Sequence, residues 1–318
     1  MPFNTTIEDV LNAGVRVDFT NDDARIADME AADQRFLQPV LGDLLAVLLS
    51  STDAKYNDVK KLCKRAEAFL AYWLDLPSIQ TRITDKSVST NDSGNSNAAH
   101  RWEFNELREM LGDKGCWNLE TLLQYLYQNA ATIGWVEPDD YKSIFRTAKD
   151  FNSIYTLFQP YRTFNAMGGI IKNVEEKYIM TAIGEDFFLY LRDYTGDDAA
   201  TKKAIKMLKQ AVAYLSIYKA TKALRVKFRS EGFTVLLNSN NDMPNQGDAN
   251  APDKQVSAMG EDAERDGGDY LEKLTAFLDK NASENVFPLY FGSEFYTAPP
   301  QPDEAPPDPN ENRAVYGL

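Results

Sequence analysis

Histidine and cysteine are scarce in this sequence of 318 residues, which contains one histidine and two cysteines. The single histidine, His100, cannot form a histidine-rich metal site, and no cysteine or carboxylate motif surrounds it. Cys63 and Cys116 lie in apolar helical patterns, so we expect buried free thiols. The lack of a disulfide framework fits a reducing compartment.

Long apolar runs are also missing. The longest covers residues 44–49, whereas a membrane span needs roughly 18 apolar residues. Residues 1–14 contain no basic stretch followed by an apolar one, so we predict neither a signal peptide nor a membrane segment. The net charge of −14 disfavours tight wrapping of DNA by the whole surface. The chain length suggests two domains of ordinary size.

Sequence motifs of catalysis are absent. There is no P-loop and no G-x-S-x-G elbow, and the Gly168-Gly169 pair lacks phosphate-cradling spacing, so we expect it to open a helix. The acidic segments 193–198 and 242–253 lack the ligand register of an EF-hand. Pairs of carboxylates do not indicate general acid–base catalysis here, because such pairs are common in so acidic a chain. We therefore predict no catalytic residue, no metal, no cofactor and no enzyme.

An internal repeat is present instead. Three blocks recur in the same order, with sequence offsets of 142, 145 and 152. Trp135 falls opposite Phe287 at the last offset. Generic amphipathic helices also resemble one another, but three ordered blocks favour the duplication of one unit. The matching blocks are 34–45 with 176–187, 66–70 with 211–215, and 119–130 with 271–282.

Each unit predicts the same series of helices. A first helix ends at Gly42 or Gly184, where glycine can form a left-handed cap. A short apolar helix, a long amphipathic helix, a polar loop or short hairpin, and a closing helical pair follow. The second unit opens with a helix over 141–158 that ends at Pro160. The expected short helices are 43–51 and 185–193, the long helices 57–74 and 199–229, the polar loops 84–98 and 238–252, and a candidate strand 233–237.

The fold class predicted is mainly α, with two tandem helical bundles and an extended proline-rich arm. The expected boundaries are 1–137, 138–287 and 288–318. Six of the 14 prolines lie between Pro299 and Pro309, which favours polyproline II geometry. Either the arm is a solvated acidic tail, or its aromatic residues bind a partner protein. The candidate partner-binding residues are Phe287, Tyr290, Phe291, Phe295, Tyr296 and Tyr316.

The stretch 199–230 contains nine lysines and arginines and no acidic residue. It has three interpretations: a solvated helix face, a docking face for the acidic surface of a neighbouring subunit, or a nucleic-acid contact. The residues expected to make an electrostatic contact between subunits are Lys202, Lys206, Lys209, Lys222, Arg225 and Arg229.

The repeated pattern resembles the head–tail connector proteins of tailed bacteriophages. The resemblance rests on the step Val40-Leu41-Gly42-Asp43, the short apolar helix and the Ala-rich helix around residues 66–70. The polar loop followed by Arg101-Trp102-Glu103-Phe104 is similar to larger connector-like proteins in phages of gut bacteria, including the crAss-like group. The resemblance covers about residues 20–135 and 165–287. This chain therefore has two such units, whereas common connectors have one.

The resemblance implies a virion protein at the head–tail junction, made in the host cytoplasm. It implies a homo-oligomeric ring, usually of about twelve subunits, that docks on the portal protein and neighbouring tail or ring proteins. DNA would pass an acidic channel without specific binding, and arms would clasp neighbouring proteins. The alternative is a monomeric helical binding or scaffold module that grips a protein partner through its proline-rich tail.

Overall fold

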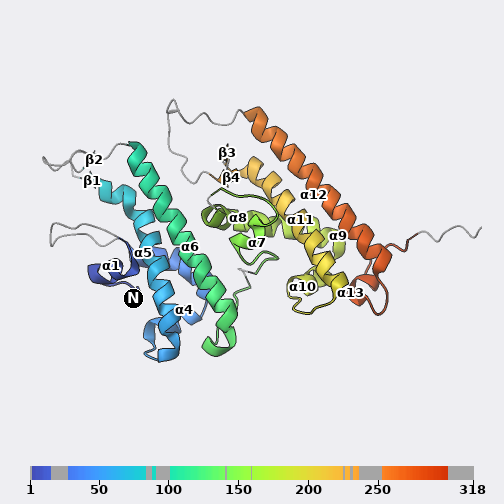
Figure 1. Cartoon of the computed structure of the whole chain (residues 1–318), viewed down its shortest axis with the longest axis horizontal. Coiled ribbons are helices and arrows are strands. Elements are labelled where there is room, and N and C mark those ends of the chain that lie inside the picture. Colours follow the sequence, from blue (N-terminus) through green and yellow to red (C-terminus); the bar gives the residue numbers. More distant parts are fainter. Residues whose placement is uncertain are drawn as a thin grey trace, which may run out of the picture.

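The computed structural model describes residues 2–15, 28–83, 88–90, 101–139, 142–158, 160–224, 226–229, 232–235 and 253–299. Within these ranges the fold is mainly α, as the helical periodicity predicted. Two long helical pairs, α5 with α6 and α11 with α12, lie in separate halves of the molecule (Figure 1). His100, Arg225 and Tyr316 lie outside the described residues.

The first half consists of short helices packed around one long helical hairpin, whose tip is a two-stranded antiparallel ribbon pairing Thr81 with Thr90. Its elements are α1 (Ile7–Ala13), α2 (Met29–Ala32), the π-helix η1 (Asp33–Leu37), α3 (Gln38–Leu41), α4 (Leu44–Ser50), the 3-10 helix η2 (Ala54–Tyr56), α5 (Asn57–Gln80), β1 (Thr81–Ile83), β2 (Val88–Thr90) and α6 (Arg101–Ile133).

Within the described residues, the second half repeats this order for the most part, without a counterpart of η2 and with α13 added after its hairpin, whose tip is a ribbon that pairs Val226 with Val235. Figure 1 shows both ribbons at the same side of the molecule, and α4 and α10 at the opposite side. The elements are α7 (Ala148–Asn152), α8 (Pro160–Val174), the π-helix η3 (Glu175–Ile179), α9 (Met180–Ile183), α10 (Glu185–Arg192), α11 (Ala199–Ala223), β3 (Val226–Arg229), β4 (Gly232–Val235), α12 (Asp253–Asn281) and α13 (Pro288–Phe291).

In each long hairpin, the two helices pack closely against each other at a glycine of the second helix. A Cβ atom added to Gly115 of α6 would lie 2.6 Å from Leu70 Cδ2 of α5, and one added to Gly267 of α12 would lie 2.8 Å from Leu215 Cγ of α11. Gly115 and Gly267 are 152 residues apart, which is the offset of the third repeated block. Leu70 and Leu215 are 145 residues apart, which is the offset of the second block. The two halves therefore bring their helices together at equivalent positions, through backbone approach that a side chain would prevent.

The buried apolar residues form two clusters, one in each half. The amphipathic spacing of α5 predicted its inward face, and Val59, Cys63 and Leu70 are fully buried there. Cys63 and Cys116 are both free and buried, as expected. After α6 the chain turns at Gly134, and Trp135 is buried with its Nε1 donating to the carbonyl of Val40 at 3.0 Å.

Gly42 and Gly184 make the turns that the sequence predicted, but in a different backbone conformation. Gly42 has φ 54° and ψ −131°, and Gly184 has φ 84° and ψ 146°. The expected left-handed helical cap was wrong, because both ψ values lie outside that region. Positive φ with extended ψ is accessible essentially to glycine alone, so the sharp change of direction between α3 and α4, and between α9 and α10, still requires this residue.

Three local expectations were wrong. Residues 141–158 do not form one helix: only α7 forms there, capped by the Thr147 side chain. Pro160 begins α8 instead of ending a helix. Proline suits the first helical position because the backbone N–H that it lacks would have no partner within the helix there. Gly168 and Gly169 lie in the interior of α8, not at its start.

The long helix predicted over 199–229 ends at Ala223, because Leu224 adopts an extended conformation and β3 follows. The candidate strand 233–237 corresponds to β4, which pairs with β3. Of the polar loops, 84–98 contains β2 and otherwise lies outside the described residues, and all of 238–252 lies outside them.

Candidate functional site

A buried glutamate on α5 holds the N-terminal segment in place. Glu67 is fully buried, and its two carboxylate oxygens accept the backbone N–H groups of Phe3 and Asn4, each at 2.7 Å. The Asn4 side chain also donates to Glu67, and to the carbonyl of Lys64 at 2.8 Å. These contacts satisfy backbone donors that the first core cluster would otherwise leave without partners.

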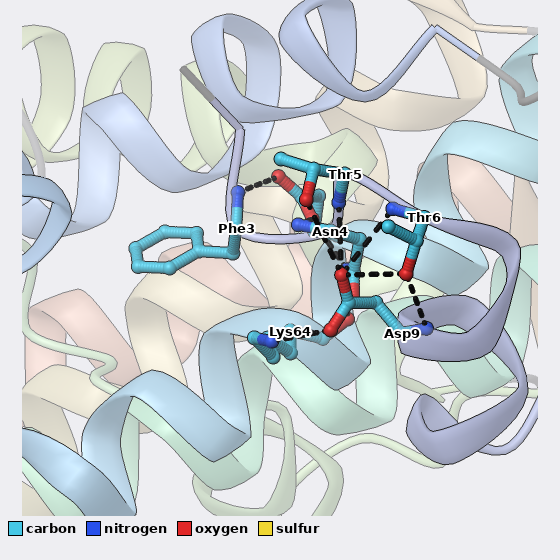
Figure 2. A network of polar contacts seen from close by, with 7 residues as sticks. Phe3, Asn4, Thr5, Thr6, Asp9 and Lys64 are labelled. Carbon is cyan, nitrogen blue, oxygen red and sulfur yellow. Dashed lines mark hydrogen bonds and ion pairs between the residues drawn. The ribbon is translucent and has the colours of Figure 1, made fainter.

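An ion pair beside this contact fixes α1. Thr6 and Asp9 form a capping box at the start of α1, and Lys64 Nζ lies 2.7 Å from Asp9 Oδ1. The hydrogen bond from Lys64 lowers the pKa of Asp9 to about 2. Figure 2 shows Phe3, Asn4 and Asp9 converging from the N-terminal segment onto the helix that carries Lys64.

Asp33 of η1 faces Glu67 inside the first unit, so two carboxyl groups share a buried site. Burial, followed by the charge of Asp33, raises the pKa of Glu67 to about 9, and burial raises the pKa of Asp33 to about 6. Two neighbouring buried carboxylates cannot both ionise easily, so the pair retains a proton near neutral pH. The site is closed by Phe3 and Asn4, which makes it a structural contact and not a substrate site.

Two further buried glutamates hold the connection between the halves. Glu120 of α6 accepts the N–H of Ala148 at 2.8 Å and that of Lys149 at 3.3 Å, at the start of α7. Glu175 of η3 accepts the N–H of Ile144 at 2.8 Å. Burial raises the pKa of both glutamates. The connecting segment is therefore bound to both units through buried hydrogen bonds.

A cavity of about 290 Å³ opens between the first half and α8 of the second. Two arginines and an amide lie among its lining residues, and no acidic residue does. Its aromatic walls come from η1 and α5. The lining residues are Arg35, Phe36, Pro39, Val40, Trp73, Cys116, Leu119, Arg162, Asn165 and Ala166.

Arg162 is the buried cation of this cavity, with 6% of its surface exposed. The charge of Arg162 affects two neighbouring groups. Burial, followed by the positive charge of Arg162, lowers the pKa of Arg108. Burial raises the pKa of Asp113, and the positive charge of Arg162 opposes this rise. Burial raises the pKa of the Cys116 thiol to about 12, so this cysteine is protonated and unreactive at neutral pH. The cavity is lined by two arginine side chains, and its cysteine offers no thiolate at neutral pH.

The predicted cationic surface is only partly assembled on α11. Lys202, Lys206, Lys209 and Lys222 lie on that helix, whereas Arg229 belongs to β3. Placing all of them on one helix was therefore wrong.

Several of these lysines interact within the chain. Lys209 forms an ion pair with Asp150 of α7, and Lys202 forms one with Asp197. Lys222 donates to the hydroxyl of Tyr218 at 2.6 Å. Exposed ion pairs contribute little, so Lys202 stays accessible to a partner together with the exposed Lys206, while Lys209 is engaged internally.

The aromatic residues assigned to a partner-binding arm mostly belong to the second core. Phe287 and Tyr290 are buried, and their rings lie 5.7 Å and 5.3 Å from the ring of Phe187 on α10. Phe295 and Tyr296 pack against the same cluster. The arm expected from residue 288 was wrong at its start, because α13 and the residues after it cover the base of the second unit.

Two hydrogen bonds to Asp279 fasten this segment to the end of α12. The Tyr290 hydroxyl donates to Asp279 Oδ1 at 2.9 Å, and the N–H of Thr297 donates to the same atom at 3.0 Å. Phe291 is the member of the predicted set that remains exposed among the residues described. The sequence signal for burial was the equivalence of Phe287 with Trp135, both of which follow a long helix.

The described residues contain no cluster of three or more His, Cys, Asp or Glu side chains placed to hold a metal ion. Among the same residues, no helix combines the length and apolar character needed to cross a membrane.

One family model matches two segments of the chain, residues 33–144 and 168–300. Together these segments cover well over half of the sequence. The chain belongs to this family of unknown function (DUF6712). The first DUF6712 segment begins at η1 and the second within α8, so the match follows the parts of the two halves that share an order of elements. Neither a curated protein nor a solved structure matches the chain significantly.

Proposed function

We propose that the chain is a virion structural protein, a subunit of a head–tail connector ring between the portal and the tail of a bacteriophage. The observation that carries this proposal is the helical unit in both halves, with its Gly42 or Gly184 step, short helix and long hairpin. The sequence pattern of this unit is the one that resembles connector proteins. The role that we assign is mechanical, and the buried carboxylates contribute to it by holding backbone segments in place.

Exposed apolar residues at the base of each unit support contacts with other proteins. They lie on or beside α4, α10 and α13, at the side opposite the ribbons in Figure 1. Such residues favour docking on another protein surface. They are Val47, Leu49 and Val136 in the first unit, and Tyr190, Leu289 and Phe291 in the second.

The exposed face of α12 supports the DNA-channel part of the proposal. Asp262 and Asp269 are exposed there and Asp266 is half-buried. A negative face repels the phosphate backbone, so DNA can pass without being held. We assign α12 to the channel side, while the exposed lysines Lys202 and Lys206 of α11 face the acidic surface of the next subunit.

Light scattering and negative-stain imaging of the purified full chain test this function. The expected particle is a ring with a mass of about twelve times 35.9 kDa, formed alone or on mixing with the portal protein of a phage that encodes the chain. A monomer under both conditions would overturn the connector proposal and favour the monomeric binding module.

A further inference from the structure

The two units contact each other through different sides. Glu120 of α6 accepts the N–H groups of Ala148 and Lys149 at the start of α7. Cys116 and Leu119 of the same helix line the cavity against α8, and each is only 4% exposed. The first unit therefore uses one face of its closing helix, α6, whereas the second unit uses the two helices that precede its hairpin.

The second unit has the same face on its own closing helix, α12, and there it is open. At the offset of 152, the three residues of α6 correspond to Gly268, Leu271 and Glu272. A Cβ atom added to Gly268 would meet nothing within 4 Å. Leu271 is half-buried and Glu272 is exposed. We call these three residues the open face of α12, because no described residue covers them as α7 and α8 cover α6.

The side of the first unit that carries α1 is the counterpart of the side of the second unit that carries α7. A threonine caps each of these helices, and an aspartate three residues later pairs with a lysine of the long helix. The two lysines are 145 residues apart, which is the offset of the second repeated block. Likewise, α2 corresponds to the end of α8 at the offset of 142. The ion pairs are Asp9 with Lys64 and Asp150 with Lys209.

The arrangement of the units leaves one side of each kind unused. Figure 1 shows both ribbons at the same side of the molecule, α1 on its left-hand side and α12 on its right-hand side. Two units with the same orientation that meet through different sides form a heterologous contact, which can be repeated from copy to copy until a ring closes. The open face of α12 and the α1 side are the two unused halves of such a contact.

The charges beside the open face match those of the α1 side. The aromatic residues of the cavity wall on η1 and α5 correspond, at the offsets of 142 and 145, to Tyr178 and Tyr218. The exposed Lys222 lies with its Nζ 4.1 Å from the centre of the Tyr218 ring. Asp28 and Glu30 are exposed at the start of α2. A cationic and aromatic surface on the second unit therefore has an acidic counterpart on the first.

We propose that the open face of α12 binds the first unit of a second copy of the chain, on the side that carries α1 and α2. The contact between chains repeats the contact that α6 makes with α7 and α8 within one chain, so copies join head to tail. The inference deepens the connector proposal, on which it rests for the presence of neighbouring copies.

Disulfide trapping in the full chain tests this contact. Lys149, which lies beside Glu120, corresponds to Glu8 at the offset of 141, so Glu8 should lie beside Glu272 of the neighbouring copy. The variants Glu8→Cys and Glu272→Cys are prepared separately, mixed and oxidised. Both positions are exposed, and the two natural cysteines are buried.

We expect a covalent dimer on a non-reducing gel, in a yield about tenfold above that of the matched control, because binding raises the local concentration of the two thiols. The control mixes Glu8→Cys with Glu106→Cys, an exposed glutamate on α6. Equal yields in the two mixtures would overturn the inference.

The double variant Glu8→Cys/Glu272→Cys tests the head-to-tail direction. Each chain then carries both halves of the contact, so a ladder of covalent oligomers beyond the dimer is expected. A product that stops at the dimer would indicate a twofold contact and contradict the proposal. A loop closed within one chain would contradict it as well.

The natural residues at this point supply a test without cross-linking. Glu8 stands where α7 has Lys149, so in the proposed contact it meets Glu272 with like charge. Glu8→Lys should tighten the association of the chain by about fivefold in sedimentation equilibrium, because an attraction replaces a repulsion. Glu106→Lys makes the same change of charge on α6 and should leave the association unchanged. Indistinguishable association in these two variants would contradict the contact.

The connector proposal and this inference can fail separately. Rings whose copies do not form the cross-link would overturn the inference and leave the connector proposal standing. A cross-linked ladder in open assemblies that never close into rings, with or without the portal protein, would overturn the connector proposal and support the contact.

Discussion

The closing helices of the two units, α6 and α12, agree on one face and differ on the other. Their inner faces place Gly115 and Gly267 against equivalent leucines. Their outer faces, aligned by the same offset, read Leu107, Met110, Lys114 and Trp117 in α6, and Met259, Asp262, Asp266 and Asp269 in α12.

Equivalent positions on the two outer faces have similar exposure, since Leu107 is 42% exposed and Met259 37%. Packing between helices tolerates few side chains at a close contact, whereas the outer face is free to change. The difference teaches that the two units share one inner contact while their outer faces differ in chemistry: largely apolar in α6 and largely acidic in α12.

The largest expected effect comes from filling the glycine contact. Gly115→Val should lower the free energy of unfolding by about 3 kcal/mol, because the new side chain would overlap Leu70. Gly267→Val should do the same against Leu215. Urea denaturation measures both.

The control is Gly168→Ala on α8, where an added Cβ meets nothing within 4 Å, so it should stabilise by about 0.5–1 kcal/mol. A lower free energy of unfolding in only one of the two valine variants would contradict the prediction that the two glycine contacts are equivalent.

A smaller effect concerns the carboxyl pair, which the second unit lacks because Val212 stands opposite Glu67 at the offset of the second block. The folded pair retains a proton up to a pKa of about 9, whereas unfolded carboxyls lose it near pH 4. The contribution of the pair to the free energy of unfolding is therefore complete below about pH 4 and is lost as the pH rises. In Glu67→Gln, the free energy of unfolding should fall by about 2 kcal/mol less between pH 5 and pH 8 than in the natural chain.

Denaturation at several pH values reads this out as a flatter profile for Glu67→Gln than for the natural chain. The exposed Glu176→Gln is the matched control and should keep the natural slope. Parallel profiles for all three proteins would show that the pair carries no shared proton.

Glu120 and Glu272 occupy equivalent positions with opposite surroundings. Glu120 is buried and caps α7, whereas Glu272 is exposed. Glu120→Ala should cost about 1–2 kcal/mol because it leaves two N–H groups without their acceptor, while Glu272→Ala should stay within about 0.5 kcal/mol. Thermal unfolding compares them. Equal losses would mean that the cap contributes nothing.

The smallest effect on stability is expected at the outer face of α6. Trp117→Asp introduces the residue type that α12 has there, and should change the free energy of unfolding by no more than about 0.5 kcal/mol. In the proposed ring, we assign the apolar outer face of α6 to a contact with a neighbouring subunit, so light scattering should nevertheless show smaller assemblies. Gln128→Asp, farther along the same helix, serves as control. An unchanged mass would remove α6 from the subunit contact.

The helical pattern could be predicted from the sequence because apolar spacing is local: the buried positions of α5 and the turns at Gly42 and Gly184 all follow from it. Pro160 was assigned to the wrong end of a helix, because proline is equally compatible with the residues after one helix and the first residue of the next. Glu67 could have been noticed as a charge between the buried Ala66 and Ala68.

The cavity could not be predicted, because it forms only where α8 meets α5 and α6, and no local pattern encodes that contact. The aromatic residues after α12 were also misassigned for this reason. Whether Phe287 and Tyr290 face a partner or Phe187 depends on the position of α10, about a hundred residues earlier in the chain.

The close approach at Gly115 and Gly267 also has a mechanical consequence. Helices whose backbones touch leave little compressible space between them, so each hairpin behaves as a stiff strut between its ribbon and the short helices at its base. A push on the ribbon at the tip of α5 and α6 should move α4 as a unit instead of being absorbed by bending. Each hairpin should therefore resist compression along its own length.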